Sequence, residues 1–177
     1  MDGGLQVEQA LLGALLLDSS AYSAVQGLHY RDFAEPLHGV IFKAIGLEIE
    51  AGRSAVPATI VKHLPPKIEI GDMTAGQYLA HLAAEAVTVA NVPDFVEVIL
   101  EDASRRKAKK LLTETLKALE GGEGYEPEPF GEVLTRTVEG LDGIATEHAH
   151  SAVPRVHLGS ASRQALDAAR EVRRLGT

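Results

Sequence analysis

Apolar residues recur with helical spacing along most of the chain, and the recurrence breaks at short clusters of Gly, Pro and polar residues. The first block, residues 5–17, is apolar on nearly every side after Gln9. This pattern is typical of a helix at the centre of a bundle. Gly13 lies within the block and should let a neighbouring helix approach closely. A short helix over residues 21–26 is expected next.

A second long helix is predicted to begin at Pro36 and to end at Gly52. Proline suits the first helical position because the N–H group that it lacks would have no partner there. The apolar positions of this helix follow the 3.6-residue period. They are Leu37, Val40, Ile41, Ala44, Ile45 and Ile49. A shorter helix, residues 57–64, should follow and end at the next Pro pair.

Thr74 and Gln77 have the spacing of a capping box, which marks the start of a helix. The helix that they open carries apolar residues on one face. These are Tyr78, Leu79 and Leu82. We therefore expect residues 1–90 to form a compact helical globule.

Two long helices are predicted after this globule, one over residues 92–119 and one over residues 130–145. A Gly-rich turn separates them, which predicts an antiparallel helical hairpin over residues 91–146. The pair has more apolar surface than its helices can bury against each other, so we expect the outer flank to contact a second subunit. The alternative is that the stripe on the second helix is only intramolecular core. The expected interface residues are Leu111, Leu112, Leu116, Leu119, Phe130, Val133, Leu134, Val138 and Leu141.

The remaining residues are predicted to form a linker and a final short helix. Residues 147–159 have no periodicity and contain Pro154, which favours a flexible linker. A short helix is predicted over residues 160–177. A helix of this length is only marginally stable alone in water, so it should dock on another part of an assembly. Its expected contact residues are Leu166, Ala169 and Val172. The fold class is therefore all-α: a compact globule, a long hairpin and a C-terminal linker helix.

The composition excludes several classes of function. The net charge of −8 repels phosphates, so strong direct binding of nucleic acid by this chain is not expected. The chain has no Cys, which excludes disulfides and thiol catalysis. Its apolar blocks are far shorter than the about 20 residues that a membrane helix needs. No secretory signal is visible, and we expect a cytoplasmic protein without a membrane partner.

Candidate catalytic and binding motifs are weak. The phosphate-binding pattern Gly-x-x-x-x-Gly-Lys-Ser/Thr is absent, so ATP hydrolysis by this chain is not expected. No cofactor and no catalytic residue is predicted, and His38 is expected to pack or hydrogen-bond within the globule. His148 and His150 beside Glu147 lack the spacing of a metal site. The basic run 105–110 either contacts phosphate or an acidic partner, or forms a solvated stripe that offsets nearby carboxylates.

Three groups of residues give the chain a resemblance to a known family. Glu8-Gln9-Ala10 leads to Leu17-Asp18, Asp32-Phe33 precedes His38 and Ile41-Phe42, and Tyr78-Leu79-Ala80 precedes Leu82, Asn91 and Arg105-Arg106. In order and spacing these residues resemble the N-terminal domain of DnaB-type replicative DNA helicases. The sequence departs from the family pattern at Ala34-Glu35 and at Ala75-Gly76. Both departures concern local packing.

The resemblance implies an assembly domain without chemistry of its own. In the family this domain forms dimers through its hairpins, and three dimers build a collar on a hexameric ring. The collar contacts primase or a helicase loader, and the linker helix packs on an adjacent motor domain, which would be expected after Thr177. The alternative is a free-standing adaptor or inhibitor that binds a helicase ring in trans. A small helical enzyme has no residue constellation to support it.

Overall fold

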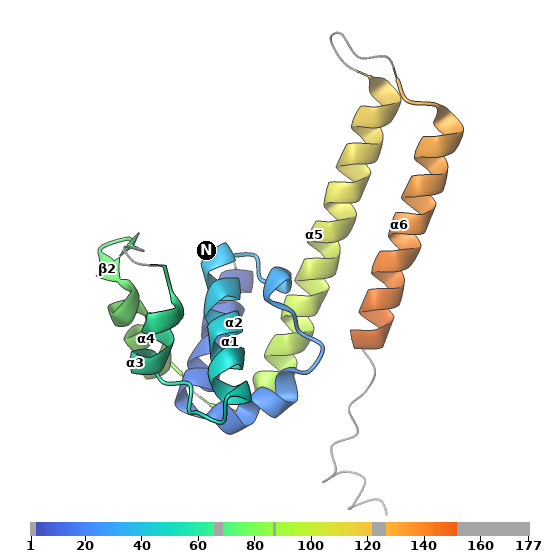
Figure 1. Cartoon of the computed structure of the whole chain (residues 1–177). Helices are drawn as coiled ribbons and strands as arrows, with labels where there is room; N and C mark the ends of the chain where they lie inside the picture. The colour runs from blue at the N-terminus through green and yellow to red at the C-terminus, as the bar shows by residue number, and fades with distance from the viewer. Residues whose placement is uncertain (1–2, 66–68, 87, 122–126, 152–177) are drawn as a thin grey trace, which may run out of the picture.

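The structure is a computed structural model that describes residues 3–65, 69–86, 88–121 and 127–151. These residues form a helical globule from which a long two-helix hairpin projects (Figure 1). The α-helices are α1 (Gly3–Leu17), α2 (Pro36–Glu50), α3 (Pro57–Ile60), α4 (Ala75–Ala84), α5 (Val92–Glu120) and α6 (Phe130–Ser151). The expected all-α class is confirmed, and the expected linker helix lies outside the described residues.

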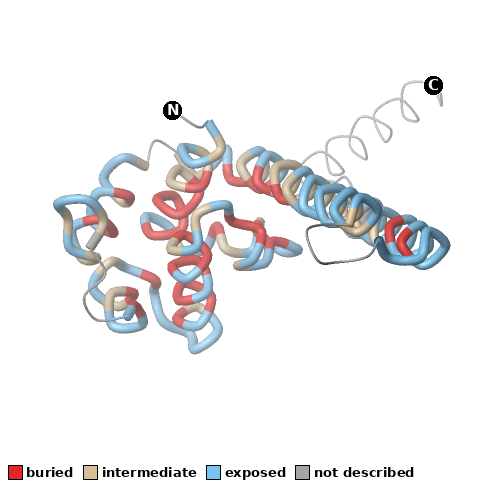
Figure 2. The backbone as a smooth tube through the Cα atoms, turned by 90° about the horizontal axis from the view of Figure 1, so that it is seen from above, coloured by how far each residue is buried: buried red, intermediate tan, exposed pale blue. Residues whose placement is uncertain are grey.

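Helix α1 is the centre of the globule, as its sequence predicts. Residues 11–16 are all buried, and α1 packs against α2, α4 and α5 (Figure 2). Leu11, Leu12 and Leu15 have no exposed surface. Six consecutive buried positions span more than a full helical turn, so neighbours are needed on every side of α1. Helices α2, α4 and α5 therefore pack around α1 as their common centre.

Gly13 is the point of closest approach between α1 and α4. A Cβ atom at this position would overlap the carbonyl oxygen of Leu82, which is a backbone atom that cannot rotate away. The expectation that Gly13 admits a neighbouring helix is therefore confirmed. The start of α4 also follows the sequence, since Gln77 N–H donates to Thr74 Oγ1 at 3.3 Å and Thr74 N–H donates to Gln77 Oε1 at 2.8 Å.

Several short segments differ from the sequence-based expectations. The helix expected over residues 21–26 is a 3₁₀ segment, η1 (Ser19–Val25), and a second 3₁₀ turn, η2 (Tyr30–Asp32), follows it. The helix expected over residues 57–64 is one α-turn, α3, continued as η3 (Val61–His63). Two short antiparallel strands, β1 (Glu69–Ile70) and β2 (Met73–Thr74), were not expected. Segments this short contain too few residues for hydrophobic periodicity to distinguish α, 3₁₀ and strand.

The buried stripe of α2 is rotated from its expected position. Val40 is 37% exposed, whereas His38, Phe42 and Glu48 are buried. Val40 follows the helical period but lies at the edge of the buried stripe, and polar residues, which an apolar periodicity count leaves out, take core positions on this helix.

A buried polar network explains one of these positions. His38 Nδ1 lies 2.7 Å from Glu8 Oε2, and His38 Nε2 lies 2.6 Å from the hydroxyl of Tyr78. The network joins α1, α2 and α4 through side chains that are each at most 5% exposed. Burial alone would raise the pKa of Glu8, but the hydrogen bond with His38 and the N–H groups of Ala34 and Glu35 outweigh it, so this pKa is lowered. His38 thus hydrogen-bonds within the globule, as expected.

A second polar cluster fixes the end of α2. The Glu48 carboxylate accepts two hydrogen bonds of 2.8 Å from Arg53 and lies 2.6 Å from His63 Nε2. The hydrogen bonds from Arg53 and then His63 lower the pKa of Glu48 from 4.5 to about 2. Because Arg53 follows α2 and His63 lies in η3, the carboxylate ties the connection between α2 and α3 to the core.

Substitution of Gly13 by Ala should destabilise the globule. The added methyl group meets backbone in a packed core, and overpacking of this kind costs about 1–3 kcal/mol. Urea denaturation followed by circular dichroism measures the change. Gly143→Ala is the matched control, because Cβ at that helical position has no atom within 4 Å and alanine there should stabilise by up to about 1 kcal/mol. Equal effects of the two variants would contradict the close approach at Gly13.

The Glu48 cluster should make stability depend on pH. A carboxyl group whose folded pKa lies below its unfolded pKa stabilises the fold above the unfolded value, and this stabilisation is lost as pH falls. For Glu48 the loss should occur between pH 4.5 and about 2. Urea denaturation should show wild type more stable than Glu48→Gln at pH 7, with the difference shrinking across that window. The exposed neighbour Glu50 supplies the control, Glu50→Gln, and an undiminished Glu48→Gln difference at pH 2 would refute the assignment.

Candidate assembly surface

Helices α5 and α6 form the hairpin, and α5 belongs to both parts of the molecule. Its first turns carry Val92, Val96, Ile99 and Ala103, all buried against the globule. The rest of α5 projects away from the globule and runs antiparallel to α6 (Figure 1). The hairpin is therefore held at one end by the hydrophobic core. In its far half, among the described residues, α5 and α6 pack against each other and not against the globule.

The seam between α5 and α6 is narrow. Val133 is 1% exposed, and the hydroxyl groups of Thr115 and Thr137 lie 2.8 Å apart. At Gly140 the helices come close enough that a Cβ atom would lie 2.7 Å from a methyl group of Leu111. Small and polar residues thus occupy much of the seam, so most of the large apolar side chains of the hairpin lie outside it.

Besides Val98 near the globule, seven large apolar side chains of the hairpin are exposed. They are Leu112, Leu116, Leu119, Phe130, Leu134, Val138 and Leu141, with exposed fractions from 37% to 67%. Within α5 the spacing is four and three residues, and within α6 it is four, four and three. Each set therefore forms one stripe along its helix.

Both stripes lie on the same broad face of the hairpin. At about 100° per residue, the stripe on each helix is offset from the seam residues by roughly a quarter turn. The two offsets have the same rotational sense along the chain, and the helices run in opposite directions. Both stripes consequently point to the same side, and we call the seven residues the apolar face. The opposite side carries Glu114 and Lys117 on α5 and Glu132 and Glu139 on α6, all exposed.

The structure divides the nine residues expected at an interface. Seven form the apolar face, whereas Val133 is buried in the seam and Leu111 packs half-buried over Gly140. Val133 was placed in the interface because spacing alone does not say which side of a stripe faces the partner helix. The residues expected to contact a neighbour from the linker helix, at 166, 169 and 172, lie outside the described residues.

The basic run at residues 105–110 is largely occupied by contacts within the chain. Arg105 pairs with Glu101 at 2.9 Å and Lys110 with Glu114 at 3.9 Å. Arg106 donates to the carbonyl oxygen of Asp32. Of the two interpretations of this run, the structure supports the one in which carboxylates of the chain offset its charge.

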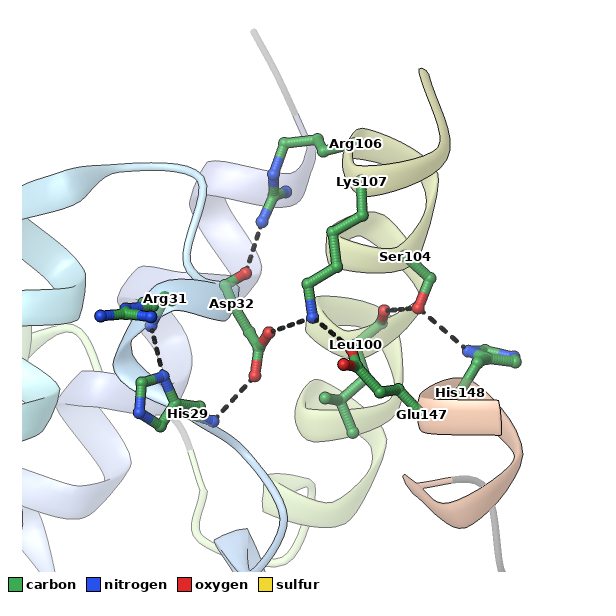
Figure 3. A network of polar contacts seen from close by, with 9 residues as sticks. All are labelled: His29, Arg31, Asp32, Leu100, Ser104, Arg106, Lys107, Glu147 and His148. Atoms are coloured by element: carbon green, nitrogen blue, oxygen red, sulfur yellow. Dashed lines mark hydrogen bonds and ion pairs between the residues drawn. The ribbon is translucent and has the colours of Figure 1, made fainter. Parts of the chain in front are cut away.

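A polar network ties the base of the hairpin to the globule (Figure 3). Lys107 Nζ lies 3.2 Å from Asp32 Oδ1 and 3.0 Å from Glu147 Oε2. His148 Nδ1 lies 3.3 Å from Ser104 Oγ, and its Nε2 lies 3.4 Å from Glu101. No local sequence pattern indicates this network, because its partners are 40 to 75 residues apart along the chain.

No chemical site accompanies these surfaces in the described part of the chain. No group of three or more His, Cys, Asp or Glu side chains there could hold a metal ion. The described helices include none with the length and hydropathy needed to cross a membrane.

A helical globule with a projecting two-helix hairpin defines a class of all-α domain, and solved structures contain the same arrangement. The crystal structure of the N-terminal domain of DnaB helicase from Mycobacterium tuberculosis superposes with a TM-score of 0.68. The match has 25% sequence identity and covers 78% of this chain and 96% of that one.

Sequence comparison agrees. The family described as DnaB-like helicase N terminal domain matches residues 3–101, and the chain belongs to this family. The replicative DNA helicase DnaB of Rickettsia conorii is 32% identical over 107 residues, which cover 60% of this chain and 22% of the relative. The replicative DNA helicase DnaB of Treponema pallidum is 30% identical over 108 residues, which cover 60% of this chain and 25% of the relative. The chain thus matches about a quarter or less of these relatives, and the resemblance seen in the sequence is confirmed.

Proposed function

We propose that the chain serves a replicative DNA helicase as its self-association and partner-docking domain, with the apolar face as the contact with a second copy. The observation that carries this proposal is the exposure of seven large apolar residues on one side of the hairpin. Contiguous exposed apolar surface of this kind marks interaction sites in soluble proteins. The family supports the choice of partner, since the relatives are replicative helicases.

The energetics are compatible with a dimer. Full burial of a large apolar side chain contributes about 1.5–3 kcal/mol, and these side chains are roughly half exposed already. Covering the apolar faces of two copies would then contribute about 10–20 kcal/mol. Association costs about 4–15 kcal/mol in lost freedom, a range that overlaps the gain, so these magnitudes allow a dimer whose population depends on concentration.

The wider assembly follows from the family. Three such dimers would build a hexameric collar, and primase or a helicase loader would dock on it. The proposed organisation has a globule at residues 1–90, a hairpin at 91–146, a linker at 147–159 and a linker helix at 160–177. Leu166, Ala169 and Val172 of that last helix would contact a neighbouring motor domain, in the cytoplasm.

The chain supplies no motor of its own in this proposal. Its 177 residues contain no Gly-x-x-x-x-Gly-Lys-Ser/Thr loop, whose amides cradle phosphate in ATP-dependent motors. A net charge of −8 also disfavours direct binding of DNA. The contribution of the domain would be to arrange copies and partners around a ring.

Charge placed on the apolar face should abolish self-association. Leu116→Glu and Leu134→Glu put a carboxylate at the centre of each stripe, where burial of an unpaired charge is unfavourable. Sedimentation velocity over a range of concentrations should show dimers or larger species for wild type and monomers for both variants. Circular dichroism checks that the helices persist, which is expected because both residues are half exposed.

The matched control is Leu47→Glu. Leu47 lies on α2 of the globule and is 47% exposed, close to the 55% of Leu116 and the 50% of Leu134. This variant should sediment like wild type. A wild-type chain that stays monomeric at high concentration would refute the proposed contact, and so would loss of assembly in all three variants.

A further inference from the structure

A cleft of about 750 Å³ separates the last turns of α6 from the globule at the base of the hairpin. It is lined by residues of the segment 27–32, by α5 between residues 100 and 107, and by α6 between residues 140 and 148. Gly143 faces open space, since a Cβ atom there would have no neighbour within 4 Å. The side chains of Glu147 and His148 hold the end of α6 here through polar contacts with α5, and the open space at Gly143 leaves α6 room to move relative to the globule.

An ammonium group bridges this cleft. Lys107 extends from α5 between Asp32 of the globule and Glu147 of α6 (Figure 3). Burial disfavours the charged form of Lys107, but the hydrogen bonds that it donates to Glu147 and Asp32 outweigh this effect and raise its pKa. Lys107 is therefore charged at neutral pH and attracts carboxylates from both sides of the cleft.

The two halves of the bridge differ in exposure. The Asp32 side chain is 7% exposed, and its other oxygen accepts the N–H of His29 at 2.8 Å. The Glu147 side chain is 67% exposed. Salt and water screen exposed ion pairs far more than buried ones. The half of the bridge that contains Glu147 should therefore open first.

We propose that the cleft is a hinge and that Lys107 is its clamp, with Asp32 as the fixed anchor and Glu147 as the arm that can be released. The consequence for assembly rests on the proposed function. Helix α6 carries four residues of the apolar face, so a shift at its base displaces that stripe relative to the stripe on α5. A closed clamp presents one continuous face to a second copy, and an open clamp presents a divided one. The clamp thereby regulates self-association from outside the contact.

The clamp stays accessible when the apolar face is covered. Ala103 and Gly143, which line the cleft, lie a quarter turn from the seam in the rotational sense opposite to the apolar face. The cleft therefore opens on the other side of the hairpin. Regulation and assembly use separate surfaces of the same two helices.

Hydrogen exchange tests the clamp in the intact chain through the variant Glu147→Gln. At low salt, amides of residues 143–151 should exchange about two- to fivefold faster than in wild type, which corresponds to the loss of an exposed ion pair. The direction of the change in exchange rate distinguishes the clamp from a local effect. A carboxylate near the C-terminal end of a helix destabilises that helix, so its removal alone would stabilise the end of α6. A purely local effect of Glu147→Gln would slow exchange.

Glu139→Gln is the matched control, since it removes the same charge about two turns earlier on α6 and away from the cleft. Its exchange at residues 143–151 should equal that of wild type. Raising the salt concentration should speed exchange in wild type and leave Glu147→Gln unchanged. Unchanged or slower exchange in Glu147→Gln, or equal acceleration in the control, would overturn the clamp.

Sedimentation of the same samples separates this proposal from the proposed function. A monomeric wild type that shows the expected exchange pattern refutes the dimer and supports the clamp. A dimeric wild type whose exchange is the same with and without Glu147→Gln refutes the clamp alone.

Discussion

The need to cover α1 on all sides determines the rest of the structure. A helix with six consecutive buried residues cannot lie at a surface, so α2, α4 and the start of α5 surround it. The close approach at Gly13 and the Glu8–His38–Tyr78 network fix how the covering helices sit. Helix α5 is the one that continues beyond the globule, so packing around α1 also sets the direction in which the hairpin leaves.

The hairpin separates two kinds of contact along one pair of helices. Near the globule, the first turns of α5 belong to the hydrophobic core, and the end of α6 is connected to Asp32 by polar contacts through Lys107. Farther out, its seam is built from Val133, the Thr115–Thr137 pair and Gly140, and the bulky side chains lie on one outer side. A narrow seam leaves more surface for a second molecule, and it makes the alignment of α6 depend on the contacts at its base.

The sequence predicts those parts of the structure that repeat over several turns. The long helices, the capping box at Thr74 and the surplus of apolar residues on the hairpin all follow from periodicity and capping chemistry. Short segments such as η1 and the β1–β2 pair contain too few residues to show a period. Val40 and Val133 show a second limit, because a stripe does not reveal which side of it meets a neighbour. The Asp32–Lys107–Glu147 bridge depends on tertiary placement, so no local pattern could indicate it.

Because the apolar face lies on only one side of the hairpin, it limits the size of the assemblies that it can form. When two identical copies associate through the same surface, each copy buries the apolar face of the other, and none of that face remains exposed for a third copy. Association through the proposed contact would therefore stop at a closed pair and would not extend into open-ended fibres. A larger ring would therefore need other surfaces of the chain for its remaining contacts.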